Sequence, residues 1–271
     1  MPVALQEGAG ATAGGRFYAI GGFDTSRNSR NLVFAFDGSK WSPGPNLPIA
    51  VNHPAAAAIG DDVYVAGGFT AGTATNRVFV LHKDARSWVE LAPMHRARGA
   101  LSLLAVESRL YAIGGRNGTT QIGIAESFDL RTNKWSDLPA MPDPRNHLAG
   151  YTDGGLACVA GGRVPTTSAA VDCYDPARSM WERPATLPNA TSGAAAAVLD
   201  GATVVAGGEL SPEARLVPLV QELRAGTWTS KPMLVPRHGM AFSVFEGRLW
   251  ACGGATAPAY QAVATCTSLG G

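Results

Sequence analysis

Short apolar segments that end in two glycines recur along the chain, and the third copy shows the pattern best. Its segment "LYAIGG" is apolar on consecutive positions, which is typical of a strand with both faces buried. The turns "ESR" and "RTNK" help to divide this copy into four pieces of four to eight residues, rich in residues that favour strands. No piece is long or periodic enough for a helix, so the pattern predicts an all-β chain.

The double glycines define a repeat that runs from one end of the sequence to the other. Their first glycines stand at positions 21, 67, 114, 161, 207 and 253, at intervals of 46 or 47 residues. The first piece of each copy is unusually small, as in "HPAAAA" and "SGAAAA", which suits strands that converge on an axis. Small sheets packed around an axis form a β-propeller. We predict a single domain over 1–271, with six blades of approximate bounds 6–48, 49–95, 96–142, 143–188, 189–236 and 237–271.

A tryptophan opens the fourth piece of five copies, at Trp41, Trp88, Trp135, Trp181 and Trp228. Its regular interval suits a large anchor packed between adjacent blades. We therefore expect four antiparallel strands in each blade. The sixth copy reaches Gly271 before any sixth tryptophan of this kind, so its blade is expected to lack the outer strand. Its last strand, around 262–268, would then be an open edge able to pair with another chain.

The combined motif resembles a known repeat. A strand, a double glycine, "VDCYDP" at 171–176, then tryptophan and "LP" or "MP" are similar to the Kelch repeat, over nearly the whole chain. The resemblance implies a six-bladed propeller with four-stranded blades. It implies little about chemistry, because Kelch propellers include adaptors, scaffolds, sugar-modifying enzymes and a copper oxidase. Arginine outnumbers lysine 18 to 4, which favours a bacterial origin.

Composition restricts the partners. The net charge of +1 gives no general attraction to nucleic acid or to a membrane surface. The chain has no apolar run near the roughly 18 residues needed to cross a bilayer, and its first residues lack the features of a signal peptide. We expect a soluble chain with no nucleic-acid or membrane partner, either cytoplasmic or secreted after loss of a leader.

The four cysteines fall at equivalent places in the fourth and sixth copies. Cys158 and Cys173 flank one glycine pair, as Cys252 and Cys266 flank another. Each pair could form a disulfide across a hairpin, or all four could be buried thiols. Their spacing matches no zinc-site template.

Arginines are concentrated in the loops that follow the double glycines and in those that lead into the first strands. Both kinds of loop lie on one face of the predicted propeller, where a positive potential would favour an anionic partner. These arginines are Arg27, Arg96, Arg98, Arg116, Arg145, Arg163 and Arg237. We assign bidentate capture of carboxylates to Arg98, Arg145 and Arg237, and regard Arg27 as a solvated charge.

Polar residues also occur where each copy enters its first strand, and these should surround the mouth of the channel. Aligning the copies places Glu7, His53, Arg98, His147, Ser192 and His238 there. The predicted ligand-binding residues are Asn52, His53, Arg96, Arg98, Arg116, Arg145, Asn146, His147, Arg163, Ser192, Arg237 and His238. The histidines raise the possibility of a metal. No sequence-local pair of ligands supports one, so we predict neither a metal nor a cofactor.

Three functions are compatible with these features. We favour the first, a binding module that recognises an acidic peptide or protein segment through the basic loop face at the channel mouth. The second is an enzyme for a small anionic substrate, resembling bacterial six-bladed Kelch mutarotases that act on sialic acid, with Glu7, His53, His147 and His238 as acid and base. The third is a structural oligomer that uses the open edge of the sixth blade, in a chain otherwise monomeric. A narrow mouth with Glu7 close to a histidine would favour catalysis, whereas a broad basic crown would favour peptide binding.

Overall fold

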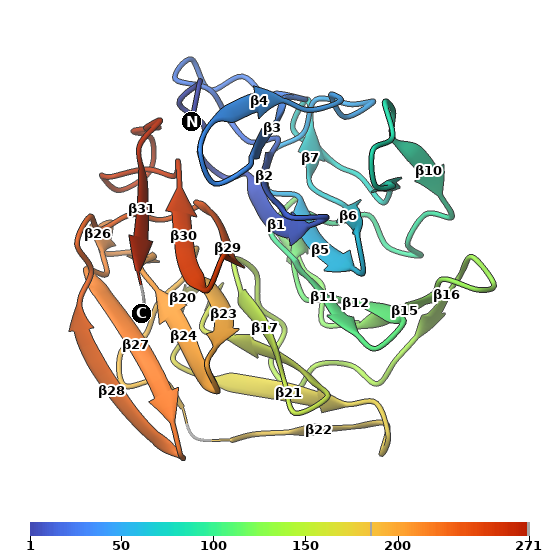
Figure 1. The fold of residues 1–271 in the computed structure, drawn as a ribbon. Coiled ribbons are helices and arrows are strands. Elements are labelled where there is room, and N and C mark those ends of the chain that lie inside the picture. Colours follow the sequence, from blue (N-terminus) through green and yellow to red (C-terminus); the bar gives the residue numbers. More distant parts are fainter. Residues whose placement is uncertain (185, 270–271) are drawn as a thin grey trace.

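The part of the chain that the structure describes forms six sheets of three or four strands arranged around a central axis, as Figure 1 shows. The computed structural model describes residues 1–184 and 186–269. Within these residues every regular element is a strand, so the prediction of an all-β propeller is confirmed. No helix in this part of the chain is long and apolar enough to cross a membrane.

Five blades have four antiparallel strands, in sequence order from the axis outward, and the sixth has three. The first three blades are β1 (Ala9–Ala13), β2 (Arg16–Ile20), β3 (Val33–Phe36) and β4 (Trp41–Pro43); β5 (Ala55–Ile59), β6 (Asp62–Ala66), β9 (Val78–Leu81) and β10 (Val89–Leu91); and β11 (Ser102–Val106), β12 (Arg109–Ile113), β15 (Glu126–Asp129) and β16 (Lys134–Asp137). The others are β17 (Ala149–Asp153), β18 (Leu156–Ala160), β21 (Val171–Asp175) and β22 (Met180–Glu182); β23 (Ala195–Leu199), β24 (Ala202–Ala206), β27 (Leu219–Arg224) and β28 (Thr227–Pro232); and β29 (Ala241–Phe245), β30 (Arg248–Cys252) and β31 (Cys266–Leu269).

The innermost strands close a circle. Each packs against the next in the order β1, β5, β11, β17, β23 and β29, and β29 packs against β1. The second strands are buried on both faces, as consecutive apolar positions predicted: Leu110, Tyr111, Ala112 and Ile113 of β12 are all buried. The apolar core lies mainly between adjacent blades, where side chains of one sheet pack against those of the next. No blade could bury its two faces alone.

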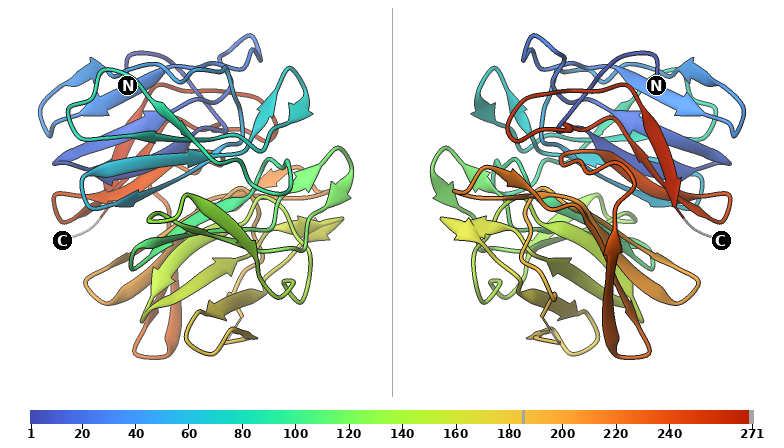
Figure 2. Two further views of the ribbon diagram at one scale, coloured as in Figure 1. Left: turned by 90° about the vertical axis from the view of Figure 1, so that its right-hand side faces the viewer. Right: turned by 90° about the vertical axis from the view of Figure 1, so that its left-hand side faces the viewer.

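Four short two-stranded ribbons follow the double glycines of blades two to five. They are β7 (Phe69–Thr70) with β8 (Thr73–Ala74), β13 (Arg116–Asn117) with β14 (Thr120–Gln121), β19 (Arg163–Val164) with β20 (Thr166–Thr167), and β25 (Glu209–Leu210) with β26 (Arg215–Leu216). Figure 2 shows that these ribbons project from one face of the propeller. The first residue of each ribbon immediately follows the second glycine of its pair, so the double glycine directs that residue onto this face.

The glycine pairs are required by both backbone conformation and space. Gly207 and Gly208 have φ angles of 65° and 98°, in a region that other residues rarely adopt. A β-carbon on Gly207 would also lie 2.2 Å from the backbone oxygen of Arg237 in the next blade. Gly207 therefore lies at a point of close contact between neighbouring blades.

The recurring tryptophans connect blades, as predicted. The indole nitrogens of Trp88 and Trp135 donate hydrogen bonds to the backbone oxygens of Pro45 and Ala92, at 2.8 and 2.9 Å. In both cases the acceptor belongs to the preceding blade. Trp181 makes the equivalent bond to the oxygen of Pro139.

The sixth blade has three strands among the described residues, as expected from the missing sixth tryptophan. Pairing through its outer strand, β31, stays a prediction. The backbone oxygen of Leu5 accepts a hydrogen bond from Gly254 at 2.8 Å, which joins the first part of the chain to the last blade.

The cysteines form two disulfides, which resolves the alternative left open by the sequence. Cys158 on β18 is bonded to Cys173 on β21, and Cys252 on β30 is bonded to Cys266 on β31. Both bonds join the second and third strands of a blade at directly opposed residues. Each therefore fixes the register of one strand pair.

Candidate functional site

Six residues with a left-handed backbone surround the axis on the ribbon face. These residues, which we call the mouth ring, are Glu7, His53, Ala100, His147, Gly193 and Gly239, with φ angles from 49° to 63°. The amide of each donates a hydrogen bond of 2.7 to 3.0 Å to the carbonyl oxygen of the ring residue in the preceding blade, and Glu7 closes the circle by donating to Gly239. Left-handed conformations are costly for residues other than glycine, and such strain is concentrated at functional sites.

The mouth ring corrects the alignment made from sequence. Three of its members differ from those expected: Ala100 takes the place assigned to Arg98, and glycines at 193 and 239 replace Ser192 and His238. Every ring residue lies fourteen positions before the first glycine of its own blade. That constant spacing was the available signal. Arg98, Ser192 and His238 do not have this spacing: Arg98 lies sixteen, and Ser192 and His238 fifteen, positions before the first glycine of their blades.

The arginines assigned to carboxylate capture lie in the interior, so that interpretation was wrong. Arg98 and Arg237 are 0% exposed, and Arg145 is 3% exposed. Arg145 donates to the oxygen of Gly161 and to Asp172, both at 2.7 Å. Arg237 donates to the oxygens of Gly253 and Thr265, at 2.7 and 2.9 Å. The guanidinium groups satisfy carbonyl oxygens near the double-glycine turns and are unavailable to a ligand.

Two other predicted ligand-binding residues also lie away from the mouth. The hydroxyl of Ser192 is fully buried and donates to the backbone oxygen of Glu209 at 3.0 Å. Arg96 is exposed and lines neither of the cavities at the mouth described below. The basic crown expected on this face therefore has fewer members than the sequence indicated.

A cavity of about 260 Å³ opens directly over the mouth ring. Side chains from several blades meet in it: Gln6, Glu7, His53, His147, Arg163, Glu209, His238 and Tyr260. Arg163 and Glu209 each follow a double glycine and form an ion pair of 2.8 Å. Arg163 was among the predicted ligand-binding residues, whereas Glu209, at the same position of the next blade, was not. Tyr260 gave no signal in the sequence, because its loop occurs in one blade only.

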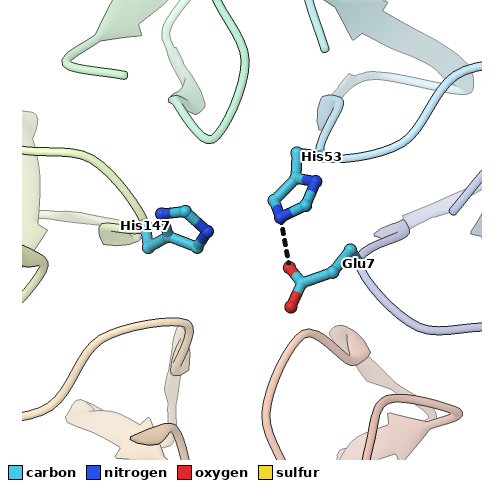
Figure 3. Close-up of side chains that lie close together, drawn as sticks. All are labelled: Glu7, His53 and His147. Atoms are coloured by element: carbon cyan, nitrogen blue, oxygen red, sulfur yellow. Dashed lines mark ion pairs between the residues drawn. The ribbon is translucent and has the colours of Figure 1, made fainter. Parts of the chain in front are cut away.

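Glu7 is at the centre of this cavity. Its carboxylate lies 3.3 Å from Nε2 of His53 and 3.1 Å from Nδ1 of His238, and Figure 3 shows its approach to His53. Burial raises the pKa of Glu7, but the attraction of His53 and the hydrogen bond from His238 outweigh this effect and hold the pKa well below its usual range. Glu7 is therefore an ionised carboxylate at neutral pH.

The two ring nitrogens of His238 face two different carboxylates. Its Nδ1 donates to Glu7, whereas its Nε2 is buried without a hydrogen-bond partner and lies 3.7 Å from Glu209. The side chain is 2% exposed and lines the cavity. Burial lowers the pKa of His238, but the bond to Glu7 and the charges of Glu7 and Glu209 raise it overall. Buried polar atoms normally have a hydrogen-bond partner, so Nε2 of His238 is a candidate for contact with a ligand.

His53 and His147 are oriented by the asparagines that precede them. Nδ1 of His53 lies 2.6 Å from the side-chain oxygen of Asn52, and Nδ1 of His147 makes the same contact with Asn146. Nε2 of His147 faces an Arg163 N–H at 3.0 Å. Burial lowers the pKa of both histidines. Asn52 and Asn146 were predicted to bind a ligand; both contact the imidazoles, and Asn52 also lines the second cavity described below.

A second cavity, of about 570 Å³, lies beside the first and shares His53 and Tyr260 with it. We call it the aromatic groove, because Phe23, Phe69 and Tyr260 line it together with Arg27 and Arg116. The Arg27 guanidinium lies 4.1 Å from the centre of the Tyr260 ring, and that of Arg116 lies 4.7 Å from the centre of Phe69. Neither arginine forms an ion pair within the described residues.

Comparison with solved structures supports the architecture. The protein described as "Structure of YjhT" superposes with a TM-score of 0.86, covering 100% of this chain and 96% of that chain. Only 18% of the aligned residues are identical, so this likeness concerns the fold alone.

Curated relatives share the repeat over about half of this chain. Alpha-scruin of Limulus polyphemus is 31% identical over 151 residues, which are 51% of this chain and 16% of that protein. Human Kelch-like protein 33 is 31% identical over 144 residues, 51% of this chain and 27% of that protein. The matched region is thus a minor part of each relative. Kelch repeat and BTB domain-containing protein 2 of cowpox virus is another relative, and these animal and viral proteins do not show the expected bacterial origin.

The family comparison covers most of the repeats. The description "KLHDC2/KLHL20/DRC7 Kelch-repeats domain" matches residues 8–208, which include the first four blades and the beginning of the fifth. Together with the six radial sheets and their double glycines, this match identifies the chain as a member of the Kelch-repeat family of β-propellers.

Proposed function

We propose that the cavity over the mouth ring binds a small anionic molecule and transfers a proton on it, with His238 as the group that moves the proton. The observation that carries this proposal is the position of His238, which lines the cavity with a buried Nε2 that lies 3.7 Å from Glu209. Its Nδ1 is held by Glu7 at 3.1 Å. An imidazole whose Nδ1 is fixed by one carboxylate and whose Nε2 lies 3.7 Å from a second is suited to general acid–base catalysis.

The two arginines of the aromatic groove favour a substrate with a negative charge. Arg27 and Arg116 contact aromatic faces and have no carboxylate partner in the described part of the chain. A guanidinium group binds a carboxylate well through two parallel hydrogen bonds. A ligand that spans both cavities would place its anionic group at these arginines and a hydroxyl or carbonyl group at His238.

A sugar acid has this distribution of groups, and its mutarotation is catalysed by proton transfers. A base removes the proton of the anomeric hydroxyl while an acid protonates the ring oxygen, so that the bond between the anomeric carbon and the ring oxygen breaks and a carbonyl group forms. The ring then closes on either face of the carbonyl group, and both protons return. Of the functions expected from sequence, this one is favoured because Glu7 lies within hydrogen-bonding reach of His238 in the cavity over the mouth ring. Binding of an acidic peptide would require exposed arginines around the mouth, but Arg98, Arg145 and Arg237 are buried.

The test is the rate at which reducing sugar acids exchange between anomers, followed by NMR with and without the protein. We expect acceleration for acidic sugars and little for neutral ones. His238→Ala should reduce the acceleration by about 100-fold or more, because general acid–base catalysis typically contributes 10²–10⁴-fold. His82→Ala is the matched control, since His82 is exposed and bonded to Asp62 away from the cavity. Full activity in His238→Ala would refute the proposed role.

Binding of an acidic peptide or protein segment is the second candidate, and the aromatic groove favours it. The groove offers three aromatic rings and two arginines in a volume larger than that of the first cavity. Aromatic and arginine side chains are enriched at protein interfaces. In fluorescence anisotropy with labelled acidic peptides, Arg116→Ala should weaken binding and His238→Ala should leave it unchanged. A peptide that binds both variants equally well would count against this candidate.

A further inference from the structure

We propose that Glu7, His53 and His147 bind a divalent transition-metal ion, and that zinc fits the site best. The three side chains come from blades one, two and four and converge over the axis, as Figure 3 shows. Each offers one ligand atom, and these atoms lie within 4.8 Å of one another. The zinc site shares Glu7 and the cavity with the proposed function, but zinc binding requires neither a substrate nor turnover.

The hydrogen bonds of Asn52 fix which nitrogen of His53 carries its proton. The amide nitrogen of Asn52 donates to Ser29 at 2.7 Å and to the backbone oxygen of Phe69 at 3.1 Å. The amide oxygen must then face His53, where only an N–H at Nδ1 can donate to it. The proton of a neutral His53 is therefore on Nδ1, and Nε2 has a free lone pair.

Asn146 does the same for His147. Its amide nitrogen donates to the backbone oxygen of Arg163 at 3.2 Å and also contacts the side-chain oxygen of Gln121. Its oxygen faces Nδ1 of His147. Metal-binding histidines typically donate their second N–H to an oxygen that fixes the ring and its tautomer. Both imidazoles already have this support.

The free lone pair of His53 points at a carboxylate. Its Nε2 is 3.3 Å from Oε2 of Glu7, and two electron-rich atoms at this distance require a cation between or beside them. Zinc binds imidazole nitrogen at 2.0–2.1 Å and carboxylate oxygen at 2.0–2.2 Å, so two ligands in tetrahedral geometry are about 3.4 Å apart. The observed separation matches that value, and a combination of imidazole and carboxylate ligands suits zinc.

Arg163 acts as a competitor in this site. One of its N–H groups faces Nε2 of His147 at 3.0 Å, and another pairs with Glu209 at 2.8 Å. Zinc would replace the first contact, while the second could hold the guanidinium aside. Because two like charges would approach each other, Arg163 should weaken metal binding. Its removal therefore has an effect opposite to that of removing a ligand.

A second group of potential ligands, formed by His95, Glu126 and Asp137, provides a control. Nδ1 of His95 is 2.7 Å from Asp137 in an exposed position, whereas Glu126 is fully buried and paired with Arg98. Arg98 already pairs with the carboxylate of Glu126, which a metal ion would need as a ligand. We expect this group to remain free of zinc.

The experiment is a calorimetric titration of zinc chloride into the oxidised chain, without a histidine tag and after removal of metals with a chelator. We expect one zinc per chain. Glu7→Gln, His53→Ala and His147→Ala should each weaken binding by at least about tenfold, Arg163→Ala should strengthen it, and His95→Ala should leave it unchanged. Alanine already occurs in the mouth ring at Ala100, so the histidine variants should fold, and their melting temperatures would check this.

Three results would overturn the proposal. One is the absence of zinc binding to the unmodified chain, which would leave a proton as the cation between His53 and Glu7. Another is loss of binding in His95→Ala with retention in His53→Ala. The third is weaker binding in Arg163→Ala. His238→Ala should still bind zinc, so failure of the proton-transfer proposal and failure of this one are distinguishable.

Discussion

Arg98 donates a hydrogen bond of 2.8 Å to Glu126 at a place where neither side chain reaches solvent. The same guanidinium also donates to the backbone oxygens of Ile124 and Ala112, at 2.5 and 3.2 Å. Burial lowers the pKa of Arg98 to about 10, so the group remains charged at neutral pH. The pair joins the loop before β11 to the second and third strands of the third blade.

Breaking this pair should destabilise the propeller strongly. Arg98→Ala leaves the Glu126 carboxylate buried without its partner, and such a change typically costs about 3–5 kcal/mol of the free energy of unfolding. Denaturant unfolding measures this loss. Arg96→Ala, two residues away and exposed, should change stability by less than about 0.5 kcal/mol.

The double variant Arg98→Met with Glu126→Leu tests the cause of that loss. It removes both charges together, so it should be less destabilising than Arg98→Ala alone. If Arg98→Ala costs no more than Arg96→Ala, the buried pair does not have the structural role assigned to it.

The architecture was predictable because one short motif carries two constraints at once. A double glycine such as that at Gly207 is needed both for a left-handed backbone and for close contact with the next blade, so its period determines the blade count. The arginines were not predictable in the same way. Arg145 looks like any loop arginine until its partner Asp172 is seen, and that residue lies 27 positions later in another strand. Tyr260 belongs to a loop outside the period, so no comparison between copies could indicate it.

Alanine substitutions at two glycines distinguish the stability cost of a left-handed backbone from that of a steric clash. Gly193 and Gly207 have similar φ angles, 63° and 65°, but a β-carbon on Gly193 would have its nearest contact at 3.7 Å, against 2.2 Å for Gly207. Gly193→Ala should therefore cost about 1–2 kcal/mol, the usual cost of a left-handed residue. Gly207→Ala should cost clearly more, because the Arg237 backbone must move. If the two variants lose the same free energy of unfolding in denaturant, the close contact at Gly207 does not contribute to the cost.

The disulfide of the fourth blade should stabilise the chain measurably. Cys158 and Cys173 are 15 residues apart, and closing a loop of that size contributes about 3 kcal/mol through the unfolded state. Replacing both by alanine should lower the melting temperature. The remaining disulfide at Cys252 and Cys266 should keep the variant sensitive to reductant, and a variant lacking all four cysteines should melt at the same temperature with or without reductant. If reductant still changed the melting temperature of the variant without cysteines, the effect would have a cause other than these disulfides.

The tautomers of His53 and His147 can be measured without any ligand. Both should carry the proton on Nδ1 when neutral, because the side-chain oxygens of Asn52 and Asn146 face that nitrogen. Two-bond proton–nitrogen correlation spectra of ¹⁵N-histidine protein distinguish this form from the commoner Nε2 form. Asn146→Ala should shift His147 toward a mixture and leave His53 unchanged, while Asn52→Ala should do the reverse. A wild-type spectrum in which Nε2 carries the proton on both rings would contradict this hydrogen-bond assignment and remove the lone pairs on which the zinc site depends.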